Sequence, residues 1–144
     1  MKYRLLLPLV VLISTLSLAV HAQARDYLTD EEVELVRDAQ QIDKRVDVLI
    51  HAIDRRFSAL KIDVGAPPHK EGSDWGAAPE GTRLQLLYDI KRILQKAIDD
   101  IDNLSGRPSS MVVEEGDKKH PPPSFNDVFP KAVRSLAAAA ERYK

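Results

Sequence analysis

TDEEVELVRDAQQIDKRVDVLIHAIDRRFSAL, residues 29–60, lies in the longest part of the chain that is free of glycine and proline. Its apolar residues recur at spacings of three, four and seven, which places them on one face of a helix. They are Leu35, Ala39, Ile42, Val46, Leu49, Ile50, Ile53, Phe57 and Leu60. We therefore predict a single helix over residues 29–60, about 46 Å long at 1.5 Å per residue. A helix of this length needs a partner helix to cover its apolar face.

The start of this helix carries a capping signal. Thr29 and Glu32 have the spacing of a capping box, in which each side chain accepts a hydrogen bond from the backbone N–H of the other residue. Asp30 and Glu31 add negative charge to the first turn, where the helix dipole favours it, and Arg55 and Arg56 lie toward the other end. The charge pattern thus agrees with the predicted helix limits.

Two further helices are predicted downstream, over residues 80–104 and 125–143. Linkers rich in proline and glycine, residues 61–79 and 105–124, separate the three helices. The predicted fold class is all-α, an extended three-helix bundle or antiparallel helical hairpin with long loops, in one domain over residues 25–144. Pro130 is expected within the first turn of the last helix, where proline is tolerated.

The helix over residues 80–104 is apolar over a wide arc. Its main stripe is Leu87, Ile90, Leu94, Ala97, Ile98, Ile101 and Leu104, and Leu86 and Ile93 widen the stripe on one side. An arc of this width predicts contact with more than one helix. Trp75, in the preceding linker, either folds back on the bundle end, which we favour, or contacts a partner.

Residues 1–24 have the pattern of a secretory signal peptide. Lys2 and Arg4 precede an apolar segment over residues 5–20, and Ala22-Gln23-Ala24 provides small residues for cleavage. The alternative is an uncleaved anchor, but the apolar segment is shorter than the roughly 20 residues of a membrane span. We expect a periplasmic or secreted protein with no stable membrane span after cleavage.

Charge and cysteine content exclude several classes of function. The chain has 21 basic and 22 acidic side chains, so loss of Lys2 and Arg4 leaves a formal charge of −3. This balance gives no electrostatic attraction to nucleic acid, and we expect no nucleic-acid partner. Because there is no cysteine, disulfides and thiolate metal sites are excluded.

The best candidate for a metal site lies on one flank of the predicted first helix. Asp47, His51 and Asp54 are about one turn apart, so a carboxylate and an imidazole could bind a divalent metal ion. The alternative, which we favour, is a solvated polar flank, because charge clusters on helices usually belong to the surface.

A second acidic group, Asp99, Asp100 and Asp102, ends the helix over residues 80–104. Negative charge at a helix C-terminus opposes the helix dipole and costs about 0.3–1 kcal/mol per residue. The spacing does not match a calcium-binding EF-hand loop.

No motif of a catalytic site is present in the sequence. It contains no Gly-x-Ser-x-Gly nucleophile motif, no phosphate-binding loop and no dinucleotide-binding fingerprint. We therefore expect no enzyme, no catalytic residues and no cofactor.

Three short segments, residues 28–32, 39–45 and 54–56, together resemble the start of a group of uncharacterised exported bacterial helical proteins. The resemblance covers about 30 residues of the predicted first helix and implies export and helicity. It brings no activity.

These observations favour an exported, non-enzymatic interaction or structural module. It would present its first helix and its two long loops to a homodimer partner or to another envelope protein. The alternative function is divalent-metal binding or sensing through Asp47, His51 and Asp54.

Overall fold

The computed structural model describes residues 25–67, 73–111 and 122–144. The predicted signal peptide lies outside these residues, as does half of the predicted linker over residues 105–124. The described residues form four α-helices and two short 3-10 helices, with no strand among them, so the all-α prediction is confirmed for this part of the chain. Within the same residues, no helix combines the length and the apolar character that crossing a membrane requires.

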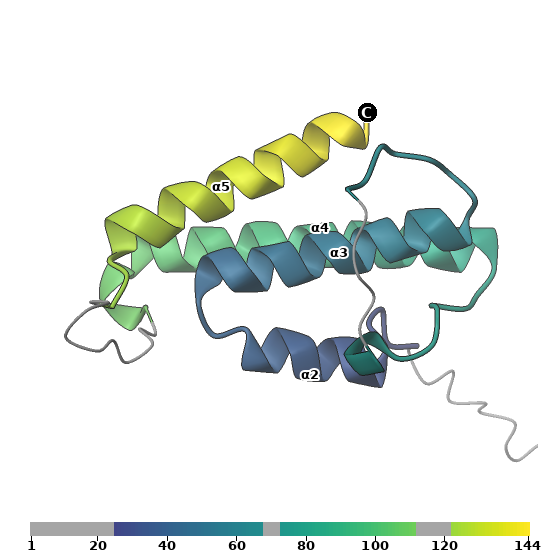
Figure 1. Cartoon of the computed structure of the whole chain (residues 1–144), viewed down its shortest axis with the longest axis horizontal. Coiled ribbons are helices and arrows are strands. Elements are labelled where there is room, and N and C mark those ends of the chain that lie inside the picture. Colours follow the sequence, from purple (N-terminus) through teal and green to yellow (C-terminus); the bar gives the residue numbers. More distant parts are fainter. Residues whose placement is uncertain (1–24, 68–72, 112–121) are drawn as a thin grey trace, which may run out of the picture.

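The helix expected over residues 29–60 is instead two helices, α2 (Asp30–Asp38) and α3 (Ile42–Ala59). Gln41 is extended, with φ −74° and ψ 138°, and the backbone N–H of Gln40 donates to the carbonyl of Asp38 at 2.9 Å. The chain reverses here, and α2 lies alongside α3 in the opposite direction (Figure 1). The prediction of one long helix was therefore wrong, although the Thr29–Glu32 capping box at its start is present.

The remaining helices are α4 (Arg83–Gly106) and α5 (Phe125–Arg142). Thr82 and Ser124 begin them, each in a capping box with the residue three positions on. The short 3-10 helices are η1 (Ser73–Trp75) and η2 (Pro108–Ser110). Pro130 lies in the second turn of α5 and not in the first as expected, so α5 tolerates the loss of one backbone N–H inside the helix.

α3 is the central helix of the fold. It packs on α4, which runs in the opposite direction behind it, and on α5, which crosses above it, while α2 lies below (Figure 1). Its buried residues therefore occupy most of its circumference and include Leu49, Ala52 and Ile53, which have no exposed surface. The apolar face of α3 is thus covered by other helices of the same chain.

The core consists of two apolar clusters that meet along α3. One joins Leu49 and Ile53 of α3 to Ile93 of α4 and to α2, and the other joins Val46 of α3 to α5. Leu136 of α5 and Tyr143, which directly follows α5, pack against both clusters. Because they share these side chains, the clusters form a continuous interior.

The core face of α4 differs from the predicted stripe. Its buried residues are Leu86, Asp89, Ile93, Ala97 and Ile101. Leu86 and Ile93, expected at the margin, thus lie in the core, whereas Leu87 and Ile98 are 39% and 38% exposed. The wide apolar arc made the centre of the stripe ambiguous, and packing against α3 selected one side of it.

Candidate functional site

The three residues of the predicted metal site lie in different environments. Asp47 is exposed, whereas His51 and Asp54 are 6% and 3% exposed. The His51 ring meets the ring of Trp75 edge to face, with their centres 4.1 Å apart. The expectation of a solvated flank is therefore wrong for His51 and Asp54, and Trp75 folds back onto α3 as expected.

Asp54 is held by the C-terminal end of α5. The hydroxyl of Tyr143 donates to its Oδ1 at 2.7 Å, and the two terminal nitrogens of Arg142 donate to its two oxygens at 3.3 and 3.2 Å. Burial, and then the hydrogen bond to Asp54, raise the pKa of Tyr143. The carboxylate thus serves to attach α5 to α3.

Among the described residues, no group of three or more His, Cys, Asp or Glu side chains is arranged to hold a metal ion. The guanidinium of Arg142 already pairs with Asp54. A metal cation that bound Asp54 would therefore have to displace Arg142. Metal binding through Asp47, His51 and Asp54 stays a prediction that the fold does not favour.

The most unusual polar feature is a buried cluster of charge that joins α2 to α3. Glu32 has no exposed surface, and the two arginines that contact it, Arg55 and Arg56, are 4% and 1% exposed. Oε1 of Glu32 accepts from Nη1 of Arg55 at 2.7 Å and from Nη1 of Arg56 at 2.6 Å. Oε2 accepts from Nη2 of Arg56 at 2.7 Å and from the backbone N–H of Thr29 at 3.0 Å. Both carboxylate oxygens are thus fully engaged.

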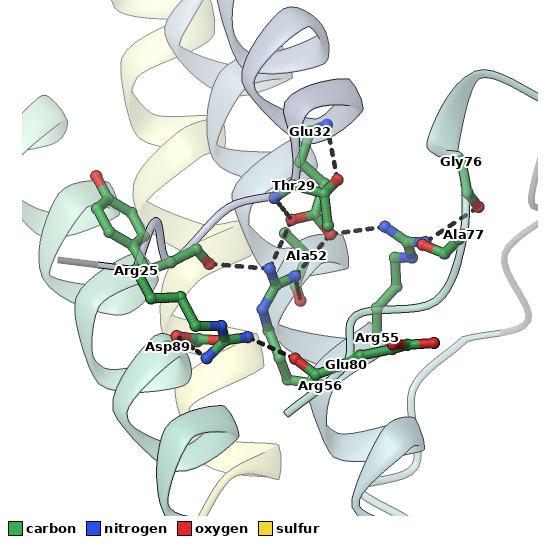
Figure 2. Close-up of polar contacts among 11 residues, drawn as sticks. Arg25, Thr29, Glu32, Ala52, Arg55, Arg56, Gly76, Ala77, Glu80 and Asp89 are labelled. Carbon is green, nitrogen blue, oxygen red and sulfur yellow. Dashed lines mark hydrogen bonds and ion pairs between the residues drawn. The ribbon is translucent and has the colours of Figure 1, made fainter. Parts of the chain in front are cut away.

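The two arginines connect this cluster to the rest of the fold (Figure 2). Arg56 also donates to the carbonyl of Tyr27 at 2.9 Å, and Arg55 donates to the carbonyl of Ala77 at 2.6 Å. The cluster therefore fixes the chain before α2 and the segment that leads to α4.

Arg25 and Asp89 form a second ion pair near this cluster. Arg25 donates to the carbonyl of Glu80 at 2.6 Å, and its Nη2 lies 2.9 Å from Oδ2 of Asp89 on α4. Burial raises the pKa of Asp89, and the charges of Arg25 and Arg56 partly oppose this shift. Arg25 thereby attaches the segment before α2 to α4.

Sequence reasoning assigned Arg55 and Arg56 to the helix dipole and Glu32 to the capping box, and it missed their ion pairs. The available signal was a pair of adjacent arginines between two residues of the apolar stripe, Ile53 and Phe57. With one continuous helix, Glu32 and Arg55 would lie about 35 Å apart at 1.5 Å per residue, so the break at residues 39–41 hid the contact.

The outer face of α4 is the main exposed apolar surface of the described residues. Leu84 is 78% exposed and Tyr88 is 55% exposed. Leu87 and Ile98 are two further exposed apolar residues on the same helix. Beside Leu84 and Tyr88, a cleft of about 550 Å³ runs between α4 and the segment before α2. Arg25 and Arg92 contribute its basic side chains, and Arg92 lies over the Tyr27 ring at 5.2 Å. Large exposed apolar side chains that cluster on one element are typical of a protein contact surface.

Comparisons with protein families, with curated proteins and with solved structures return no match for this chain. The resemblance to exported bacterial proteins stays a prediction, and the function has to be argued from the residues themselves.

Proposed function

We propose that this chain is an exported, non-enzymatic interaction module that contacts a protein partner through the outer face of α4. The observation that carries the proposal is the exposure of Leu84 and Tyr88, 78% and 55%, on a helix whose opposite face is buried. Of the five large hydrophobic residues that are exposed in the described part of the chain, four lie on α4. Isolated exposed apolar residues are ordinary, but a group on one helix is typical of a contact site.

The location differs from the one that the sequence suggested. The first helix was expected to be presented to a partner, but α3 is covered by α4 and α5. The outer face of α4 therefore replaces it in the proposal.

The buried acidic groups support a non-enzymatic role. Each of Glu32, Asp54 and Asp89 is held by at least one arginine, as described above. A buried carboxylate whose oxygens already accept hydrogen bonds from arginine side chains has few acceptor positions left for a substrate. The same pairs hold the helices that support α4 in place.

A photo-crosslinking amino acid placed at position 88 tests the proposal in intact cells. We expect a discrete crosslinked protein species from position 88. The same probe at position 133 is the matched control, because Val133 is 40% exposed but lies on α5. Equal labelling from both positions, or none from either, would contradict the proposed surface. The mass of the protein from the same cells tests export, since cleavage after Ala24 would leave Arg25 as the first residue.

A further inference from the structure

The charge pattern of α4 is reversed relative to its neighbours. α2, α3 and α5 each carry an acidic residue in the first turn and a basic residue in the last, as the helix dipole favours. α4 has no acidic residue in its first turn and no basic residue in its last. It begins with Arg83 and carries Asp99 and Asp102 toward its end. The exposed charges of its first half are basic because Asp89 is buried, and its second half is acidic overall because Lys96 is paired with Asp100.

The exposed side of α4 has the spacing of a helix–helix contact. Residues 84, 88, 91, 95, 98 and 102 follow alternating steps of four and three, the pattern of a coiled-coil seam. They are Leu84, Tyr88, Lys91, Gln95, Ile98 and Asp102, and all six are exposed. The core residues Leu86 and Ile93 point the opposite way, so this seam is separate from the face that packs on α3.

We propose that the partner is a second copy of this chain, and that the two α4 helices pair in antiparallel orientation along this seam. With the two-fold axis at the level of Ile93, residues equally far from Ile93 face each other. Tyr88 then packs on Ile98 of the partner subunit, and Leu84 and Arg83 lie beside Asp102 of the partner subunit. This inference rests on the proposed function and names its partner.

Charge complementarity selects both the partner and the orientation. Antiparallel pairing places Arg83 beside the partner's Asp102, and it places Lys91 opposite the partner's Gln95, one helical turn from the partner's Asp99. The two helix dipoles also run in opposite directions. Parallel pairing would instead bring Lys91 next to the partner's Lys91 and Asp102 next to the partner's Asp102. Because one α4 carries both halves, a second α4 is the complementary surface, and a two-fold axis satisfies both ends at once.

The first test is the mass of the protein in solution, measured by light scattering after size exclusion. We expect the mass of a dimer for the natural protein and of a monomer for the double variant Leu84→Glu, Tyr88→Glu. The matched control is Val133→Glu, an exposed apolar position outside the seam, which should stay dimeric. A natural protein that is monomeric at every concentration measured would overturn the self-pairing.

Cysteine crosslinking tests the orientation, and the natural chain has no cysteine to interfere. Under mild oxidation, a mixture of the Tyr88→Cys and Ile98→Cys proteins should form covalent dimers, whereas Tyr88→Cys alone should form none. In the antiparallel pair the two copies of position 88 are about 15 Å apart, too far for a disulfide, which needs Cα atoms within about 7 Å. Crosslinking of Tyr88→Cys with itself, or no crosslinking in the mixture, would overturn the proposed pairing.

The outcomes separate this inference from the proposed function. A monomeric protein whose position 88 still crosslinks to a different envelope protein would refute the self-pairing and leave the contact surface standing. A monomer with no crosslink at position 88 would refute both.

Discussion

Glu32 balances the charge of two buried arginines, and its loss should be costly. Glu32→Gln removes the negative charge and leaves Arg55 and Arg56 buried beside a neutral side chain. Breaking a buried ion pair by neutralising one partner costs about 3–5 kcal/mol. We expect the free energy of unfolding, measured by urea denaturation, to fall by about that amount.

Glu34→Gln is the matched control for this change. Glu34 lies on the same helix and is also paired with an arginine, Arg37, at 2.7 Å, but both side chains are more than half exposed. Exposed pairs of this kind contribute about 0–1 kcal/mol. Equal stability of the two variants would show that the buried cluster does not stabilise the fold.

The contact of Tyr143 with Asp54 of α3 should make the free energy of unfolding depend on pH. The pKa of Tyr143 is raised above the ordinary value of 10.0, first by burial and then by the hydrogen bond to Asp54. The folded protein therefore keeps the phenol proton when the unfolded chain loses it. The stabilisation is complete below about pH 10 and is lost as the pH rises further.

We expect Tyr143→Phe to lower the free energy of unfolding by about 1 kcal/mol at neutral pH, since one hydrogen bond is lost. Above about pH 10 this difference should shrink, and urea denaturation over a pH series measures it. Val128→Ala is the control, because it removes buried apolar contact from α5 but no ionisable group, and its effect on the free energy of unfolding should not change over this pH range. A difference between Tyr143→Phe and the natural protein that stays constant with pH would contradict the assignment.

At the scale of the residue, the sequence predicted local features well and contacts across the fold poorly. The Thr29–Glu32 capping box depends on neighbouring residues and is present. The contacts of Glu32 with Arg55 and of Asp54 with Tyr143 join residues far apart in the chain. Helical periodicity places residues on a face, but it does not say which distant side chain will cover that face.

Pro130 is an unusual element-scale feature, because it lies inside α5 and not at its start. Its ring supplies no backbone N–H to the carbonyl of Asn126, one turn earlier. Pro130→Ala restores this donor, and we expect the free energy of unfolding in urea to rise by about 1–3 kcal/mol.

Pro67→Ala serves as the control for this prediction, since Pro67 lies in an exposed non-helical segment. There the change only adds freedom to the unfolded chain and should lower stability by less than about 1 kcal/mol. If Pro130→Ala were no more stable than Pro67→Ala, the missing N–H of Pro130 would not lower the free energy of unfolding, and the prediction would be wrong.

The turn between α2 and α3 is the part of the secondary structure that the sequence did not predict. Residues 39–41 contain no glycine or proline, and the apolar spacing continues through them. The turn allows α2 to fold back, so that Glu32 reaches Arg55 and Arg56. Tertiary contacts therefore overrode a local preference for helix that the sequence shows clearly.

At the scale of the molecule, the shared side chains of the two core clusters predict cooperative unfolding. Leu136 and Tyr143 pack against both clusters, and Arg55 joins the charged cluster to Trp75, whose ring centre lies 5.5 Å from its guanidinium carbon. Loss of either cluster exposes part of the other, so we expect no populated intermediate.

Trp75 allows this cooperativity to be measured, because it is the one tryptophan of the chain. Its fluorescence reports the packing of η1 on α3, whereas far-UV circular dichroism reports all helices together. We expect the two urea transitions of the natural protein to coincide, and both midpoints to move together in Glu32→Gln. A fluorescence transition at lower urea than the loss of helix would mean that the segment around Trp75 detaches by itself. In that case the contact of Arg55 with Ala77 would not tie this segment to the rest of the fold, and the chain would not unfold as one unit.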